Sequence, residues 1–206
     1  MDTNTKKTKV LVLIDCQNDF IDGSLANKDA QACIPTIVEK IKNFDGDAIF
    51  FTMDSHKEDY LDTPEGKKLP VEHCIYDTHG WNLNKDIFKA IYEDVDHDKI
   101  KIRGIYKPTF ASVVSFDNGK KLFNRPKTLV EEILELEKGT EKPIPMEIEM
   151  CGFCTDICVI SNALALKGFT YDFAEITVDS KCCAGVTPEK HEAALEVMRS
   201  CQINVI

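Results

Sequence analysis

The feature that most constrains the fold is an alternation of short apolar runs with segments of helical periodicity. The run TKVLVLI at 8–14 and the run AIFFT at 48–52 are typical of strands buried on both faces of a sheet. Other segments repeat apolar residues at three- and four-residue spacing, which predicts helices. The predicted strands are 8–14, 48–52, 99–105, 146–152, 170–178 and 203–206, and the predicted helices are 31–43, 85–93, 126–138, 156–167 and 187–200.

Strands that alternate with helices are joined by right-handed crossovers and form a mostly parallel sheet covered on both faces. The predicted fold class is therefore α/β, with three layers and a six-stranded, mostly parallel, doubly wound sheet. The chain has 206 residues, 43% of them hydrophobic, so we expect one domain over 1–206 with its own core. Residues 55–84 show no clean period, and so long a loop in a compact domain is usually functional.

The charge of the chain bears on its partners. Thirty-five acidic residues against 25 basic ones give a net charge of -10, which disfavours nucleic acid and anionic membrane surfaces as partners. The apolar run VLVLI is too short for the core of a signal peptide, and no apolar segment reaches the length of a membrane helix. We therefore expect a cytoplasmic protein whose partner is a small molecule.

The nine cysteines form an odd set in a chain far longer than a secreted disulfide scaffold. In a reducing compartment they are expected to be free thiols, most of them small buried hydrophobic residues. The question is then which thiol, if any, is reactive.

Polar or reactive residues follow four of the predicted strands. They are Asp15, Asp54, Lys107 and the segment 151–158. In a parallel sheet the carboxyl ends of the strands meet at one edge, where ligands bind. The sequence therefore predicts that these four features lie together.

Cys158 is the candidate nucleophile. It lies near the start of a predicted helix, with Thr155 or Asp156 as the N-cap, and the helix dipole is expected to lower the pKa of its thiol. The alternative is a buried core cysteine, since free cysteines are among the most buried residues. Asp15 closes an apolar strand, so its desolvated carboxylate suits a general base, whereas a turn residue is the plain alternative. Lys107 taken alone is more often a solvated lysine.

Two metal sites can be read from the sequence. In the loop at about 54–84, Asp54 and His56 are followed 17 residues later by His73, which offers oxygen and nitrogen ligands to a divalent ion. A polar surface loop is the alternative. Cys151, Cys154 and Cys158 have the spacing C-x2-C-x3-C, which would suit a metal-binding or thiol redox protein. They straddle a strand end and a helix start, which should spread them apart.

Four motifs together resemble the isochorismatase-like cysteine hydrolases, and within them the nicotinamidases. They are LIDCQNDF at the first strand, MDSH after the second, YKPTFAS in the middle and GFCTDICV before a late helix. The resemblance covers nearly the whole chain and implies a six-stranded, largely parallel sheet. It places a catalytic triad on Asp15, Lys107 and Cys158, and an oxyanion hole on the backbone amides of Cys154 and Cys158. It also implies a cis peptide between Phe153 and Cys154.

The resemblance also assigns metal ligands, with Zn²⁺ as the expected ion. Asp54, His56 and His73 match the nicotinamidase pattern, but a further histidine of that pattern is replaced by Leu61 and Asp62. Glu65 is the best candidate for the additional ligand, and Asp62 is the second choice.

The expected pocket differs from that of nicotinamidases in one respect. An aromatic residue that they often carry before the second metal histidine is absent from the segment 69–73, LPVEH. Phe20 matches the aromatic wall after the first strand, with a core phenylalanine as the alternative.

The implied reaction is hydrolysis of a small primary amide, nicotinamide first, through a cysteine thioester. A related amidase acting on a carbamoyl or ureido compound is the alternative. Isochorismate cleavage fits less well, because enzymes of that type generally lack the nucleophilic cysteine. The resemblance also implies a homo-oligomer.

Overall fold

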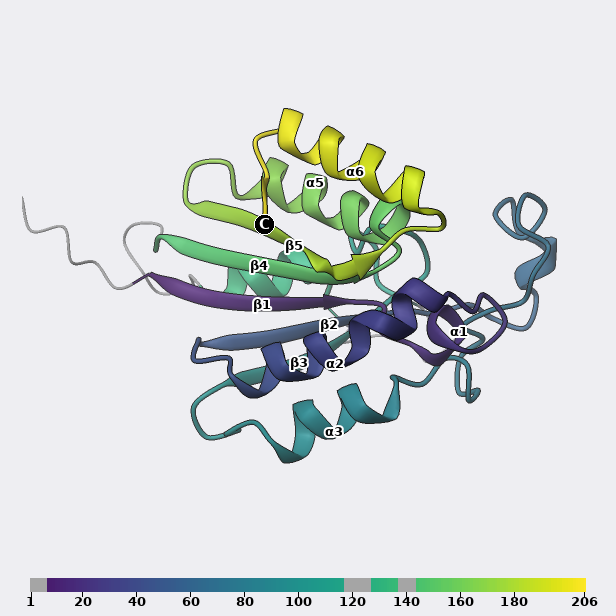
Figure 1. The fold of residues 1–206 in the computed structure, drawn as a ribbon, viewed down its shortest axis with the longest axis horizontal. Coiled ribbons are helices and arrows are strands. Elements are labelled where there is room, and N and C mark those ends of the chain that lie inside the picture. Colours follow the sequence, from purple (N-terminus) through teal and green to yellow (C-terminus); the bar gives the residue numbers. More distant parts are fainter. Residues whose placement is uncertain (1–6, 117–126, 137–143) are drawn as a thin grey trace, which may run out of the picture.

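The computed structural model describes residues 7–116, 127–136 and 144–206, and its centre is a six-stranded sheet. The strand order is β3-β2-β1-β4-β5-β6, and every neighbouring pair is parallel, which confirms the predicted α/β class. Figure 1 shows the strands side by side with their carboxyl ends toward one end of the molecule. The strands are β1 (Thr8–Ile14), β2 (Ala48–Asp54), β3 (Lys101–Lys107), β4 (Met146–Phe153), β5 (Ala174–Ala184) and β6 (Asn204–Val205).

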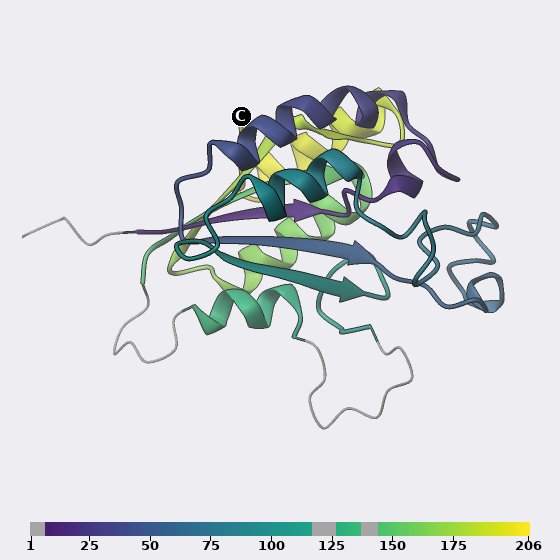
Figure 2. The same cartoon turned by 90° about the horizontal axis from the view of Figure 1, so that it is seen from below.

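Helices cover both faces of this sheet, as predicted. Figure 2 shows α2 and α3 on one face and α4 on the opposite face. The helix α5 packs against α4, and α6 packs against α5. The helices are α1 (Asn18–Ile21), α2 (Lys28–Lys42), α3 (Lys85–Glu93), α4 (Leu129–Glu135), α5 (Ile160–Phe169) and α6 (Pro188–Ser200).

Burial of the central strands explains the layered arrangement. All seven residues of β2 are buried, and so are the last five of β1, which leaves neither strand a solvent face. Helices must cover both faces of such strands, and apolar burial of this kind is the main force that stabilises a fold. On the rest of the sheet, Met146, Ile148 and Met150 of β4 point into the core while Glu147 and Glu149 do not.

The structure corrects several predicted boundaries. The fifth strand was predicted at 170–178 but runs from Ala174 to Ala184, because Thr170 closes α5 by donating its backbone N–H to the carbonyl of Leu166. The polar residues DSK at 179–181 interrupt the apolar pattern, so the sequence did not predict the second half of this strand. Two short elements were not predicted, the helix α1 and the 3-10 turn Tyr60–Asp62.

Two predicted helices also differ in detail. The helix expected at 156–167 begins with a π-helical turn, Thr155–Val159, whose N-cap is Cys154 rather than Thr155 or Asp156. The helix expected at 126–138 appears as α4, fixed by a capping box between Thr128 and Glu131. Its predicted ends at 126, 137 and 138 lie outside the described residues.

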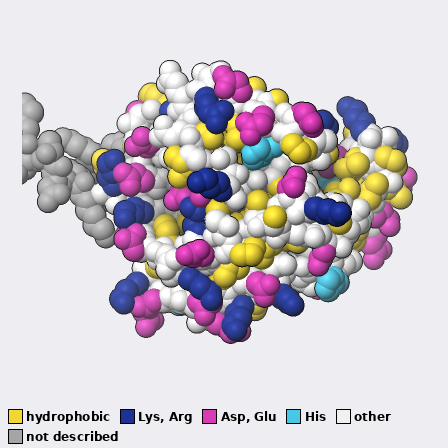
Figure 3. Space-filling model, in the orientation of Figure 1, with side chains coloured by type: hydrophobic (Ala, Val, Ile, Leu, Met, Phe, Trp, Pro, Cys, Tyr) yellow, Lys and Arg dark blue, Asp and Glu magenta, His cyan; other side chains and the backbone are white. Residues whose placement is uncertain are grey.

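The irregular segment 55–84 projects beyond the carboxyl ends of the strands, visible beside α1 in both ribbon views (Figures 1 and 2). The side-chain amide of Gln17 ties it to the sheet by donating to the carbonyls of Asp54 and Trp81, at 2.9 and 2.7 Å. Over the face that carries α2 and α3, acidic and basic side chains are interspersed (Figure 3). Among the helices described, none is long and apolar enough to cross a membrane.

Gly152 on β4 is a position where the backbone itself demands glycine. Its φ is +124°, and a Cβ atom built there would lie 2.0 Å from the carbonyl oxygen of Ile14 on the neighbouring strand. We expect Gly152→Ala to lower the free energy of unfolding by at least about 2 kcal/mol, through backbone strain and the clash together. Chemical denaturation of the two proteins measures this difference.

A matched control is Gly168→Ala on the exposed side of α5, where an added Cβ meets nothing within 4 Å. That change should stabilise the helix by roughly 0.5–1 kcal/mol, since alanine is the better helix former. Equal effects of the two substitutions would contradict the account of Gly152.

Candidate active site

Three groups from distant parts of the sequence meet at the carboxyl edge of the sheet. Lys107, the last residue of β3, is fully buried, and its Nζ lies 2.7 Å from Oδ2 of Asp15 and 3.5 Å from Sγ of Cys158. Asp15 follows β1 with a φ of +47°, a conformation that Asp tolerates better than most residues. The predicted proximity of the triad is confirmed, while the roles of its members stay predictions.

The Asp15 carboxylate is surrounded by protein. Its Oδ1 accepts a hydrogen bond from the Thr52 hydroxyl at 2.6 Å. Its Oδ2 faces the Lys107 ammonium and accepts no hydrogen bond of good geometry from the described residues. Desolvation raises the pKa of Asp15, and Lys107 only partly opposes that effect. A carboxylate whose proton affinity is raised in this way suits a general base.

Cys158 lies in the first turn after β4, with its side chain 4% exposed. The expectation of a lowered thiol pKa is wrong for the resting protein. Burial raises the pKa of Cys158 well above its ordinary value, the Lys107 charge opposes this, and the Asp15 charge and a hydrogen bond to Asp15 add to it. Desolvation therefore raises the pKa of this thiol despite its place at a helix start, and the Lys107–Asp15 ion pair lies beside the sulfur.

Asp54 joins this cluster to a second one. Its Oδ1 lies 3.3 Å from the Lys107 ammonium, whereas its Oδ2 lies 3.1 Å from Nε2 of His56 and 3.6 Å from Nε2 of His73. Burial alone would raise the pKa of Asp54, but Lys107 and the two histidines together hold it below its ordinary value. A single ionised carboxylate thus contacts both the lysine and the histidines, a link that the sequence did not reveal.

Asp54, His56 and His73 have the geometry of a metal site. Of the residues in 7–116, 127–136 and 144–206, they alone form a group of three or more His, Cys, Asp or Glu whose ligand atoms all lie within 4.8 Å of one another. Nitrogen and oxygen ligands held about 2 Å from one ion in tetrahedral geometry are separated by about 3.3 Å, close to the 3.1 and 3.6 Å between Oδ2 of Asp54 and the two histidine nitrogens. His73 is also oriented for the role, because its Nδ1 lies 2.8 Å from the carbonyl oxygen of Val71 and leaves Nε2 toward Asp54.

The candidate fourth ligands differ in position. Oε1 of Glu65 lies 3.8 Å from Nε2 of His56, and its side chain is partly buried. Asp62 is exposed to solvent in the 3-10 turn. The structure therefore favours Glu65 over Asp62 as the residue beside the metal group.

The three cysteines read as a rival metal or redox site are spread over different surroundings. Cys151 is buried within β4, Cys154 is the N-cap of the π-helical turn, and Cys158 faces Lys107. They form no metal-ligand group of the kind made by Asp54 and the two histidines. All nine cysteines of the chain are free thiols, as predicted.

A cavity of about 1070 Å³ opens onto both clusters. Cys154, Cys158, Asp54 and His73 line it, and so does Phe20, which packs edge-on against His73 at 5.8 Å between ring centroids. Phe20 is also 6% exposed, so it belongs both to the core and to the cavity wall.

The peptide bond between Phe153 and Cys154 is cis, as the resemblance implied. Further lining residues are Gly23, Ser24, Leu25, Ala26, Asn27, Lys28, Pro64, Glu65, Lys68, Leu69, Thr109, Phe110, Ile157, Val186 and Lys190.

Several supporting residues were not predicted. Thr52 orients Asp15, and Gln17 holds the end of β2 by accepting the backbone N–H of Asp54 at 2.7 Å. Asn162 donates to the carbonyls of Cys158 and Phe110, at 2.8 and 2.9 Å, and so connects the helix start to the segment after β3. The signal for Thr52 was present, since it is a polar residue in an otherwise apolar strand; Asn162 gives no comparable signal.

The fold and this cavity define a doubly wound α/β protein with a thiol, a carboxylate and an ammonium group at the carboxyl edge of its sheet. The family model described as the isochorismatase domain matches residues 9–206, and the chain belongs to the isochorismatase family. It is 30% identical over 194 residues to an uncharacterized isochorismatase family protein of Bacillus subtilis, covering 91% of this chain and 92% of that one.

Solved structures are similar over nearly the whole chain. A nicotinamidase/pyrazinamidase from Bacillus subtilis superposes with a TM-score of 0.72 at 28% identity, covering 96% of this chain and 98% of that one. A pyrazinamidase of Pyrococcus horikoshii in complex with zinc superposes with a TM-score of 0.68 at 25% identity and the same coverage.

Proposed function

We propose that this protein hydrolyses a small primary amide, with nicotinamide as the first candidate substrate, through a thioester on Cys158. The observation that carries the proposal is the contact of a buried thiol with a buried Lys107–Asp15 ion pair beside a cavity. Nicotinamidase and pyrazinamidase activities in the names of structural neighbours support it. A related amidase for carbamoyl or ureido compounds is the second candidate, because the segment LPVEH, which ends at the proposed ligand His73, lacks an aromatic residue.

In this mechanism Asp15 removes the thiol proton as the sulfur attacks the amide carbonyl. Lys107 opposes the effect of burial on the pKa of Asp15, so it favours the ionised carboxylate before the transfer and stabilises the charges that remain. The backbone amides of Cys154 and Cys158 hold the oxyanion. Asp15 then returns the proton to the departing ammonia, and afterwards takes a proton from the water that cleaves the thioester.

We further propose that Asp54, His56 and His73 hold a divalent ion, Zn²⁺ first, with Glu65 beside them. One carboxylate with two imidazoles is a donor set that suits zinc. When bound, the ion would supply a Lewis-acid contact for a lone pair of the substrate and so help to orient it. The ionised state of Asp54 and the fixed ring of His73 prepare the site for a cation.

The metal proposal predicts that His56→Ala lowers bound zinc from about one ion per chain to a small fraction, since one of three close ligands is lost. Elemental analysis after dialysis against a weak chelator measures the ratio. His97→Ala is the control, because His97 stacks on Tyr92 far from Asp54 in the sequence and is absent from the ligand group. Full zinc retention in His56→Ala, or loss after alkylation of the thiols, would contradict this site.

The reaction itself is tested by measuring ammonia release from nicotinamide by the zinc-loaded protein, with ureido and carbamoyl compounds in the same panel. Turnover of nicotinamide above the others supports the first candidate. Turnover confined to a ureido or carbamoyl compound replaces it with the second. An absence of turnover for every amide in the panel would overturn the proposed function.

A further inference from the structure

Three lysines from separate parts of the chain line the cavity that holds Cys158. Lys28 is the first residue of α2, Lys68 lies in the segment 55–84, and Lys190 lies in the first turn of α6. All three are exposed to solvent, which places them at the mouth of the cavity rather than its floor. The chain has a net charge of -10, so a group of three ammonium groups around one opening differs in sign from the net charge of the protein.

Within the part of the chain that the structure describes, none of these three ammonium groups lies within ion-pair distance of a carboxylate. The two acidic residues lining the cavity are engaged elsewhere, since Asp54 contacts Lys107 and Glu65 lies beside His56. The three ammonium groups at the opening are therefore not held in direct ion pairs by the described carboxylates.

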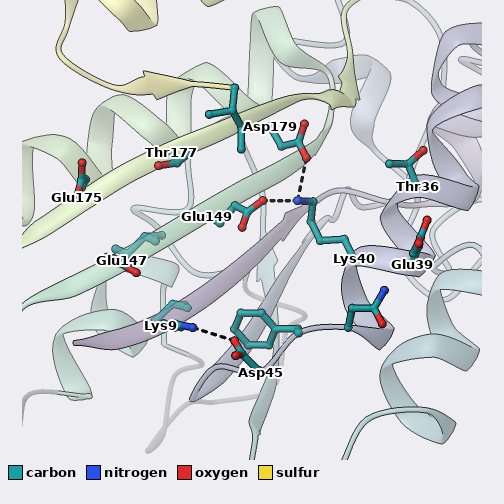
Figure 4. A pocket seen from close by; sticks show the side chains of 15 residues that line it. Lys9, Thr36, Glu39, Lys40, Asp45, Glu147, Glu149, Glu175, Thr177 and Asp179 are labelled. Carbon is teal, nitrogen blue, oxygen red and sulfur yellow. Dashed lines mark hydrogen bonds and ion pairs between the residues drawn. The ribbon is translucent and has the colours of Figure 1, made fainter. Parts of the chain in front are cut away.

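A second groove, of about 750 Å³ near the amino ends of β1, β4 and β5, shows the opposite arrangement (Figure 4). There Lys40 contacts Glu149 and lies 2.8 Å from Asp179, while Lys9 lies 2.9 Å from Asp45. The lysines in that groove are neutralised by the protein itself. The lysines at the mouth of the Cys158 cavity are left for a ligand.

The helices α2 and α6, of 15 and 13 residues, both begin at the cavity wall and bring Lys28 and Lys190 to its mouth. Each first turn also carries one acidic residue, Asp29 in α2 and Glu189 in α6. The two starts are joined, because the side-chain amide of Asn27 donates to the carbonyl oxygen of Gly185 at 2.8 Å. Lys28 and Lys190 are thereby carried on one fixed wall.

We propose that the cavity accepts, beyond neutral nicotinamide, primary amides that carry an anionic group, a carboxylate or a phosphate, held at this mouth by Lys28, Lys68 and Lys190. This inference rests on the proposed function and extends its substrate class. The amide end lies at Cys158 and the anion at the opening. A cavity of about 1070 Å³ is slightly larger than the usual range for drug-sized ligands and leaves space beyond a single small ring.

The test compares matched amides that differ in charge. Succinamate is paired with neutral butyramide, and nicotinamide mononucleotide with nicotinamide riboside, which has the same pyridinium charge but no phosphate. We expect kcat/KM to favour the anionic member of at least one pair, and to fall for that member alone as salt is raised. A preference in the first pair assigns a carboxylate, and one in the second pair assigns a phosphate. Equal values within both pairs would overturn the proposal.

Substitutions locate the effect. The double substitution Lys68→Gln/Lys190→Gln should raise KM for the preferred anionic amide by about 10-fold and leave its kcat little changed. KM and kcat for the paired amide that lacks the anionic group should also change little. Lys67→Gln is the matched control, since Lys67 is exposed, adjacent and not part of the cavity lining. Equal losses for charged and neutral amides, or an equal effect of Lys67→Gln, would sink the idea.

Titration calorimetry on Cys158→Ala measures ligand binding without turnover, so it tests the anion site independently of the proposed reaction. Binding of succinamate or nicotinamide mononucleotide that is weakened by the double lysine substitution supports the anion site even if no amide is hydrolysed. Binding unaffected by the substitution overturns it, whatever the turnover.

Discussion

Replacing Cys158 by alanine is expected to reduce kcat/KM for the amide substrate by on the order of 10⁴-fold or more, the scale of losing the nucleophile in covalent catalysis. The reason is that the described residues place no other thiol against Lys107. Fold stability should change much less than activity. Ammonia release measures the first effect, and thermal unfolding the second.

Two further cysteine variants make this result specific. Cys201→Ser changes an exposed thiol remote in sequence from the cavity and should leave activity unaltered. Cys154→Ala removes a side chain that lines the cavity but keeps the backbone amide proposed for the oxyanion, so most activity should survive. Appreciable turnover by Cys158→Ala, or equal losses in Cys154→Ala, would instead favour a shared thiol function.

The sheet was predictable because each central strand is a continuous run of apolar residues. The runs at 8–14 and 48–52 are apolar without alternation, and only a strand covered on both faces explains this pattern. The late strand β5 was misplaced because Asp179, Ser180 and Lys181 interrupt its apolar residues. Its register against β4 also shifts between Met150 and Gly152, and local sequence does not specify such irregularities.

The site was predictable to the extent that strand ends determine it. Asp15, Asp54 and Lys107 each end or follow a strand, so topology alone brings them to one edge. The direction of the pKa shift of Cys158 could not be predicted from the sequence. A helix start lowers the pKa of a thiol while burial raises it, and the balance depends on packing. The oligomeric state, the cytoplasmic location and the organisation as one domain stay predictions.

Lys107→Met is expected to cost both stability and activity, because it removes a cation that contacts two buried carboxylates. Oδ2 of Asp15 and Oδ1 of Asp54 lie 2.7 and 3.3 Å from its Nζ, and all three side chains are almost fully excluded from solvent. Removing one partner of a buried ion pair leaves an uncompensated charge, which typically costs about 3–5 kcal/mol. Urea denaturation of metal-free protein at neutral pH measures this loss, and turnover should fall along with it.

Lys101→Met on the same strand is the matched control. Its Nζ pairs with Glu132 at 2.9 Å but is 29% exposed, so its loss should cost less than about 1 kcal/mol. A comparable loss from both substitutions would mean that Lys107 acts only as an ordinary surface charge.

The pH dependence of Lys107→Met separates electrostatic from packing effects. Burial already raises the pKa of Asp15 in the folded protein, and loss of Lys107 removes the largest influence that opposes it. A carboxyl whose folded pKa lies above its unfolded value binds more protons when folded, so stability falls as pH rises through that range. The variant should therefore recover stability relative to wild type as pH is lowered. Adding Asp15→Asn should restore part of the stability at neutral pH without restoring turnover. A deficit independent of pH and unrelieved by Asp15→Asn would show that methionine simply fits the space badly.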